Sequence, residues 1–123
     1  MKRALIAWGP AVTWATVLFL LSEVGSLPPI VWLALHDKLV HLALYGVLGG
    51  TLAWGYRMSG GVLPHWAAIG LGIVYGAIDE LHQQFVPNRM PSVGDFAADV
   101  VGVIAGYSIV LIVWAAVTRT RSS

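Results

Sequence analysis

The sequence lacks cysteine and has very little charge. The absence of cysteine excludes disulfide bonds, thiolate zinc sites and cysteine nucleophiles. Charged residues make up only 11% of the 123 residues, and seven basic against six acidic residues give a formal net charge of +1. The only basic run is Met1-Lys2-Arg3, whereas a nucleic-acid-binding surface needs a basic patch or stripe. We therefore expect no nucleic acid among the partners.

Apolar residues dominate instead. They make up 58% of the chain, and the mean hydropathy of +0.78 excludes a water-soluble domain. Four apolar stretches approach the roughly 20 residues that cross about 30 Å of hydrocarbon as a helix. Breaks at Pro28-Pro29, Gly60-Gly61 and Pro87 separate them. We predict an all-α fold, a single domain over residues 1–123 that forms an integral membrane bundle of four transmembrane helices. The predicted helices cover about residues 4–21, 38–56, 64–85 and 93–117.

The first apolar stretch also resembles a signal peptide, because it follows Met1-Lys2-Arg3. It is long for the apolar part of a signal peptide, however, and no Ala-x-Ala cleavage pattern follows it. We expect the stretch to be retained as the first span. Gly9-Pro10 would loosen one turn of this helix, which neighbouring helices can tolerate.

The basic residues predict the orientation in the membrane. With an even number of spans, five of them fall on one side and two on the other. The five are Lys2, Arg3, Arg57, Arg119 and Arg121, and the two are Lys38 and Arg89. Cytoplasmic loops carry the excess of Lys and Arg, so we expect both termini in the cytoplasm and a multi-pass protein of the cell membrane. Predicted interfacial anchors are Trp32, Trp66 and Trp114.

Polar side chains within the predicted helices gather on the opposite, outer side. Helical spacing aligns them in stripes, with steps of four residues from Asp37 to His41, from Asp79 to Gln83 and from Asp95 to Asp99. A charge deep in hydrocarbon costs about 2.5–3.5 kcal/mol on insertion scales, so these side chains should face a protein-lined cavity. We expect the carboxylates of Glu80 and Asp99 and the ring of His41 to converge there.

Three pairs of glycines have the four-residue spacing that lets membrane helices approach closely. They are Gly46 and Gly50, Gly72 and Gly76, and Gly102 and Gly106. In the last predicted helix the glycines continue the stripe of Asp95 and Asp99, so both carboxylates should point toward neighbouring helices. The same glycine faces could join copies of the chain in a homo-oligomer.

Structural roles compete with functional ones at several of these residues. Asp37 directly precedes the predicted second helix, and we favour a role as its N-cap. Ser92 and Asp95 form a capping-box pattern, which explains Asp95 as well as a chemical role does. Asp99 lies one turn deeper and has no such explanation. For the buried charges as a group, a structural ion-pair network is an alternative equal to a catalytic site.

Several spaced motifs resemble those of one family. They are Asp37-Lys38-Leu39-Val40-His41 followed by Tyr45, Asp79-Glu80-Leu81-His82-Gln83, Pro87-Asn88-Arg89, and Asp95 with Asp99. Together they cover roughly residues 37–106 and resemble the VanZ-like family of small bacterial membrane proteins, named for a teicoplanin-resistance protein. The resemblance implies a bacterial inner-membrane location, and it links particular members of the family to glycopeptide antibiotic resistance. It does not supply a reaction.

Two hypotheses about function follow. In the first, the protein is a hydrolase or transferase acting on an envelope lipid or lipid-linked precursor, with a divalent metal as its cofactor. In the second, it binds or masks an amphiphile, such as a cell-wall precursor or a lipoglycopeptide antibiotic, without breaking a bond. A proton or ion carrier fits less well, because the sequence places no acidic residue in the inner half of the bundle.

The same polar residues serve both hypotheses. The predicted catalytic residues are His41, Asp79, Glu80 and Asp99, acting as acid, base or metal ligand. The predicted substrate-binding residues are Asp37, Lys38, Gln83, Arg89 and Asp95, with Lys38 and Arg89 holding a phosphate.

Overall fold

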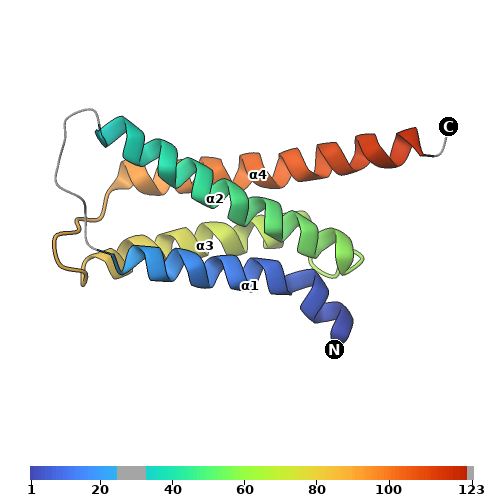
Figure 1. Cartoon of the computed structure of the whole chain (residues 1–123), viewed down its shortest axis with the longest axis horizontal. Helices are drawn as coiled ribbons and strands as arrows, with labels where there is room; N and C mark the ends of the chain where they lie inside the picture. The colour runs from blue at the N-terminus through green and yellow to red at the C-terminus, as the bar shows by residue number, and fades with distance from the viewer. Residues whose placement is uncertain (25–32, 122–123) are drawn as a thin grey trace.

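The computed structural model describes residues 1–24 and 33–121, with the backbone alone at residues 33–35. Four helices follow one another in up-and-down order (Figure 1). They are α1 (Lys2–Ser22), α2 (Leu33–Met58), α3 (His65–Gln83) and α4 (Val93–Thr120). The described part of the chain contains no strand, so the predicted all-α fold is confirmed. The predicted break at Pro28-Pro29 and the predicted anchor Trp32 lie outside the described residues.

Three of the described helices are long and apolar enough to cross a membrane. They are α1, residues His36–Met58 of α2, and α4. α3 has 19 residues, and polar side chains occupy its C-terminal turns. These lengths and compositions are those of a multi-helix membrane protein, as the hydropathy of the sequence predicts.

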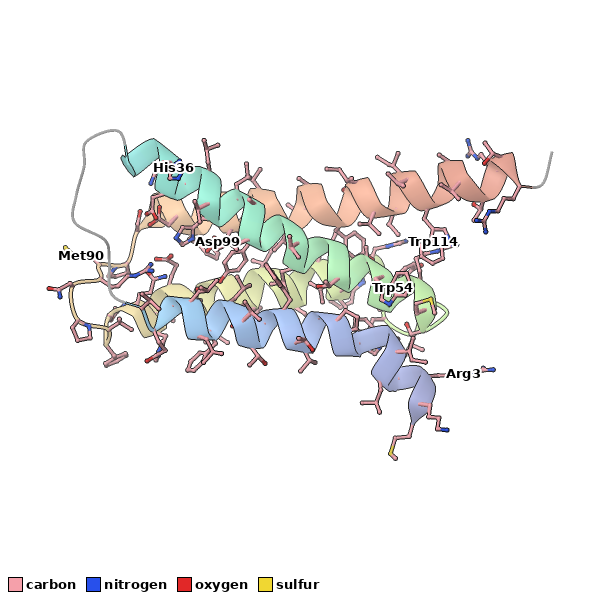
Figure 2. The ribbon with its side chains drawn as sticks, in the orientation of Figure 1. Arg3, His36, Trp54, Met90, Asp99 and Trp114 are labelled. Atoms are coloured by element: carbon pink, nitrogen blue, oxygen red, sulfur yellow. The ribbon has the colours of Figure 1, made fainter. Side chains whose placement is uncertain are left out.

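Charge is divided between the two ends of the bundle. All six acidic residues lie where α1 and α3 end and where α2 and α4 begin, which we call the acidic end. They are Glu23, Asp37, Asp79, Glu80, Asp95 and Asp99. The opposite end, which we call the basic end, holds both termini and the α2–α3 connection (Figure 1). Its basic residues are Lys2, Arg3, Arg57, Arg119 and Arg121. Figure 2 places Asp99 near the first end and Arg3 at the second.

Several helix boundaries differ from the prediction by one to five residues, and two of them bear on the acidic end of the bundle. α2 begins at Leu33 instead of near residue 38, because Leu, Ala and Leu at positions 33–35 are strong helix formers. Asp37 therefore lies inside α2, and its predicted role as the N-cap is wrong. α3 ends at Gln83 instead of near residue 85. The next three N–H groups bond to carbonyls three residues back, until Pro87 offers no N–H.

Glycine brings the backbones of α2 and α4 into direct contact. This helix pair is the most extensive in the bundle. A Cβ atom built on Gly106 would lie 1.8 Å from the carbonyl oxygen of Gly46, and one on Gly102 would lie 2.5 Å from that of Leu42. Only glycine fits at such distances. The predicted close approach is thus present within the chain, whereas homo-oligomers through these faces stay a prediction.

Glycine also fixes how α3 crosses the other two helices. A Cβ atom on Gly72 would lie 2.8 Å from a methyl carbon of Val103, and one on Gly76 would lie 3.2 Å from the ring of Tyr45. The Gly76 position also lies 3.4 Å from the Cβ atom of Asp99. This contact places the next turn of α3, which begins with Asp79 on its buried face, against α2 and α4.

The N-terminal part of α1 bends away from the rest of the helix (Figure 1). Pro10 lacks an N–H, so the carbonyl of Ile6 loses the intrahelical partner it would normally have. The indole Nε1 of Trp54 in α2 donates to that carbonyl at 3.1 Å. One turn further along, Trp14 Nε1 donates to the Leu44 carbonyl at 2.8 Å. The side chain of Trp54 therefore replaces the hydrogen bond that Pro10 removes, which is how a neighbouring helix tolerates Gly9-Pro10 within α1.

Candidate functional site

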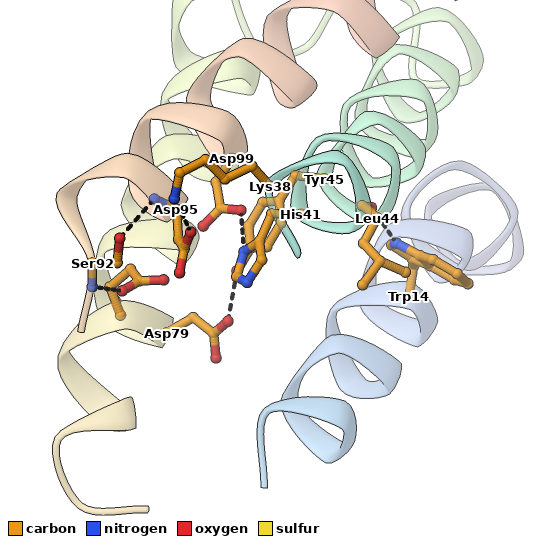
Figure 3. Close-up of polar contacts among 10 residues, drawn as sticks. Trp14, Lys38, His41, Leu44, Tyr45, Asp79, Ser92, Asp95 and Asp99 are labelled. Atoms are coloured by element: carbon orange, nitrogen blue, oxygen red, sulfur yellow. Dashed lines mark hydrogen bonds and ion pairs between the residues drawn. The ribbon is translucent and has the colours of Figure 1, made fainter. Parts of the chain in front are cut away.

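Side chains of α2 and α4 meet in two ion pairs at the acidic end. Lys38 Nζ lies 2.9 Å from Asp95 Oδ1, and one turn deeper His41 Nδ1 lies 2.8 Å from Asp99 Oδ1 (Figure 3). The Lys38 side chain is 45% exposed, so the first pair lies at the surface. His41 and Asp99 are 8% and 1% exposed, so the second pair is buried. The two pairs lead from the solvent into the bundle.

The His41–Asp99 contact orients the imidazole. An ionised Asp99 accepts hydrogen bonds only, so His41 donates to it from Nδ1. In the neutral imidazole, Nε2 then carries the lone pair, which is the form in which histidine binds a metal or takes up a proton. A carboxylate behind a histidine in this way is a common arrangement at metal sites and in acid–base catalysis.

α3 adds two more carboxylates to the same place. The hydroxyl of Tyr45, one turn after His41, donates to Asp79 Oδ2 at 2.9 Å. Glu80 Oε2 accepts the main-chain N–H of Ser92 at 2.9 Å. Seven residues from three helices thus form what we call the polar cluster: Lys38, His41, Tyr45, Asp79, Glu80, Asp95 and Asp99.

Two carboxylate oxygens in the polar cluster are buried without a hydrogen-bond partner among the described residues. They are Glu80 Oε1 and Asp99 Oδ2. Both residues are more than nine-tenths buried. A buried oxygen without a partner costs about 1–3 kcal/mol, and more when the group is charged. These two oxygens are therefore the places in the cluster where an external ligand would gain most.

The residues that carry these two oxygens, together with His41, suit a metal ion. His41, Glu80 and Asp99 each offer one ligand atom, and the three atoms lie within 4.8 Å of one another. One imidazole nitrogen with two carboxylate oxygens is a ligand set for divalent ions such as Mn²⁺ or Zn²⁺. Asp37, His41 and Asp95 form a second such group nearer the solvent, where Asp37 is exposed.

The electrostatic balance of the acidic end also favours a cation. Its six carboxylates outnumber its two permanently positive side chains, Lys38 and Arg89. Lys38 already pairs with Asp95. In a low-dielectric bundle, carboxylates this close repel one another unless a positive group lies among them. An anionic head group alone would add to that repulsion.

The structure does not place every predicted site residue in the polar cluster. Arg89 donates from Nε to the carbonyl of Val24 at 3.3 Å, and this contact joins the α3–α4 loop to the end of α1. Gln83 is buried on the face of α3 that also carries Asp79 and Glu80. His82 pairs with Glu23 and thus binds α3 to α1. Arg89 therefore has a local structural role that the sequence did not predict.

Asp95 divides its two predicted roles between backbone and side chain. Its N–H donates to Ser92 Oγ at 3.3 Å, so Ser92 is the N-cap of α4. The Asp95 carboxylate bonds to Lys38 and does not complete the capping box. Glu80, from another helix, accepts the Ser92 N–H in its place. The local pattern at Ser92 thus predicts the cap but cannot show that its second half comes from α3.

Tyr45 is the contributor to which the sequence assigned no role. It is 2% exposed, and its ring lies 6.4 Å from that of His41 in a stacked arrangement. Its position four residues after His41 continues the stripe that begins at Asp37. An aromatic hydroxyl on a polar helix face is thus the feature by which sequence reasoning could have found it.

Comparison with known proteins agrees with the resemblance of the motifs. The family model VanZ/LLP1 matches residues 6–114, which include the polar cluster and parts of all four helices. The comparisons with curated proteins and with solved structures give no match. Because the family model matches most of the chain, the protein belongs to the VanZ/LLP1 family.

Proposed function

We propose that the protein is a membrane-embedded, divalent-metal-dependent hydrolase or transferase that acts on the phosphate-bearing head group of an envelope lipid or lipid-linked precursor. In this proposal all four helices span the cell membrane, substrates enter from the outer leaflet, and both termini are cytoplasmic. Five basic residues at the basic end, against two at the acidic end, support this orientation.

One observation carries the proposal. Glu80 Oε1 and Asp99 Oδ2 are buried without partners, and both carboxylates offer ligand atoms within 4.8 Å of one on His41. A bundle held together only by ion pairs gains nothing from such oxygens, because each one costs stability. Residues His41, Glu80 and Asp99 would hold the metal. When bound, the metal would supply the positive charge that a phosphate needs and would activate a water molecule.

The chain's other residues then have definite tasks. Asp99 holds the imidazole of His41 by the 2.8 Å contact, and Tyr45 holds Asp79 by the 2.9 Å hydrogen bond. Lys38 lies at the surface of the cluster and can move from Asp95 to a phosphate oxygen. Asp37, exposed beside it, lies where a head group would enter the cluster. An amphiphile whose tail stays in the lipid would thus reach the cluster with its head group.

A second candidate function is binding without chemistry. The excess of carboxylates over basic side chains at the acidic end would attract a positively charged amphiphile directly. In that case the protein would sequester the amphiphile, and a lipoglycopeptide antibiotic with an amino group would be of suitable chemistry. The two functions differ in whether a product appears.

Purified protein loaded with Mn²⁺ or Zn²⁺ and incubated with envelope lipid extract tests the proposal. Mass spectrometry should detect a metal-dependent loss of a phosphate-containing lipid and the appearance of its cleaved or transferred product. Asp99→Asn should abolish the change while the protein stays folded. If the wild-type protein retains a lipid or an antibiotic unchanged and forms no product with either metal, the sequestering function is correct instead.

A further inference from the structure

The basic end contains a cavity that the polar cluster does not use. It has a volume of about 420 Å³, within the range of small-molecule sites, and lies between the end of α2 and the C-terminal half of α4. Its walls are apolar except for Thr118 and Arg121. Lining residues that matter here are Trp54, Ile109, Val113, Trp114, Val117 and Arg121.

Two tryptophans form a fixed wall of this cavity (Figure 2). The Trp54 ring meets the Trp114 ring edge-on, with centroids 5.6 Å apart. Trp54 cannot turn easily, because its Nε1 donates to the Ile6 carbonyl left without a partner by Pro10. The guanidinium carbon of Arg57 lies 5.3 Å from the Trp114 ring centroid, within cation–π range. A positive charge is thus held beside a rigid aromatic wall.

The rest of the cavity wall is a face of α4 that no other described helix covers. α4 diverges from its neighbours and projects past them at the basic end (Figure 1). Ile109 and Val113 are 59% and 55% exposed, and Val117 is 46% exposed. They follow one another at four-residue steps, so they form an apolar strip that leads to Arg121. The strip has the shape that a single acyl chain lying along a helix requires.

The charge at this end selects the head group. Five basic residues are at the basic end, and all six acidic residues are at the acidic end. Basic pockets between membrane helices bind the phosphates of anionic lipids. We propose that the cavity is a binding site for an anionic phospholipid, whose acyl chain lies on Ile109, Val113 and Val117 and whose phosphate meets Arg121. Tryptophan at the level of the head groups is typical of such a position.

A second copy of the chain is the competing occupant, and charge disfavours it. A parallel dimer through the C-terminal half of α4 would bring two sets of the same arginines together, with no acidic side chain at that end to separate them. A phospholipid instead brings the negative charge that the site lacks.

Native mass spectrometry of the full chain in detergent tests this inference. The protein is mixed with phosphatidylglycerol or with phosphatidylcholine of the same acyl chains. We expect phosphatidylglycerol to be retained, and Arg121→Gln to weaken its binding about fivefold. Val113→Trp, at a half-exposed position, should fill the cavity and abolish retention of phosphatidylglycerol. Arg3→Gln removes the same charge at the same end but outside the cavity lining, and should leave retention unchanged.

Three results would overturn the inference. Equal retention of the two lipids by the wild-type protein would show that charge does not select the ligand. Retention of phosphatidylglycerol by both Val113→Trp and Ile109→Trp would show that the lipid binds elsewhere. A lipid-free dimer that Val113→Trp dissociates would make a second copy the occupant. Metal binding at the acidic end is measured on the same variants. A failure of the lipid-binding inference can then be told apart from a failure of the proposed metal-dependent function.

Discussion

The main-chain N–H of Ser92 donates to Glu80 Oε2 at 2.9 Å, so a carboxylate of α3 completes the N-terminal cap of α4. This one contact occupies half of the Glu80 carboxylate and leaves the other half, Oε1, buried without a partner. One oxygen of Glu80 therefore holds the start of α4, and the other is available to bind a ligand. The connection also fixes the position of α4 relative to α3 at the depth where Asp99 faces His41.

Two substitutions at Glu80 separate these roles. Glu80→Gln keeps an oxygen that can accept the Ser92 N–H and removes the charge, so the protein should stay folded with little change in melting temperature. Glu80→Ala removes the acceptor and should lower the stability by about 1–3 kcal/mol. Thermal melting in detergent measures both. Equal destabilisation by the two variants would mean that the charge, and not the cap, holds this region together.

Tyr45→Phe should destabilise the bundle through Asp79. The substitution removes the hydroxyl that donates to Asp79 Oδ2 and leaves a buried carboxylate with one contact fewer. We expect a loss of about 1–3 kcal/mol for the single variant. Asp79→Asn should be milder, because its amide oxygen can still accept from Tyr45. A double-mutant cycle between Tyr45→Phe and Asp79→Leu should give a coupling energy; additive effects would contradict the contact.

The Trp54 hydrogen bond should matter only while Pro10 is present. Trp54→Phe leaves the Ile6 carbonyl without a donor in a lipid environment, and we expect a cost of about 0.6–1.7 kcal/mol. Pro10→Ala restores the intrahelical N–H, so the cost of Trp54→Phe should shrink in that background. Melting of the four proteins of this cycle is the measurement. An unchanged cost in the Pro10→Ala background would show that Trp54 acts through its ring packing alone.

Glycine substitutions test the contact between α2 and α4. Gly106→Ala would place a Cβ atom 1.8 Å from the Gly46 carbonyl oxygen, so the two backbones must separate. We expect destabilisation of about 1–3 kcal/mol or failure to fold. Gly70→Ala is the matched control, because nothing lies within 4 Å of a Cβ atom there, and it should be neutral or stabilising. Similar melting of both variants would contradict the packing.

Sequence reasoning succeeded where a residue's face follows from its own helix. The four-residue steps from Asp37 to His41 and from Asp95 to Asp99, with the glycines that follow, predict that these polar side chains point toward neighbouring helices. The structure has this arrangement, with His41 beside Asp99 and Lys38 beside Asp95. The helical class and the apolar spans follow from hydropathy alone.

The sequence alone did not predict which distant segments contact one another. Asp37 was assigned to a cap because it directly precedes an apolar run, yet α2 begins at Leu33. Ser92 shows a local capping pattern, and only the fold reveals that Glu80 accepts its N–H. Arg89 was expected at a phosphate, and its hydrogen bond to the Val24 carbonyl was not predicted. The contacts of Ser92 and Arg89 depend on which helix end lies next to which loop, and that is a property of the packed bundle. The start of α2, in contrast, follows from the strong helix formers at positions 33–35.

Binding of a divalent metal to the purified protein tests the central claim most directly. Mn²⁺ binding is followed by electron paramagnetic resonance on the wild-type protein and on three folded variants. Asp99→Asn and Glu80→Gln should each weaken binding by at least about tenfold, whereas Asp79→Asn, a buried carboxylate outside the ligand group, should leave it nearly unchanged. Affinity should fall as the pH is lowered, because protons compete for the ligands. No binding of Mn²⁺ or Zn²⁺ by the wild-type protein, or equal binding by all three variants, would contradict the account.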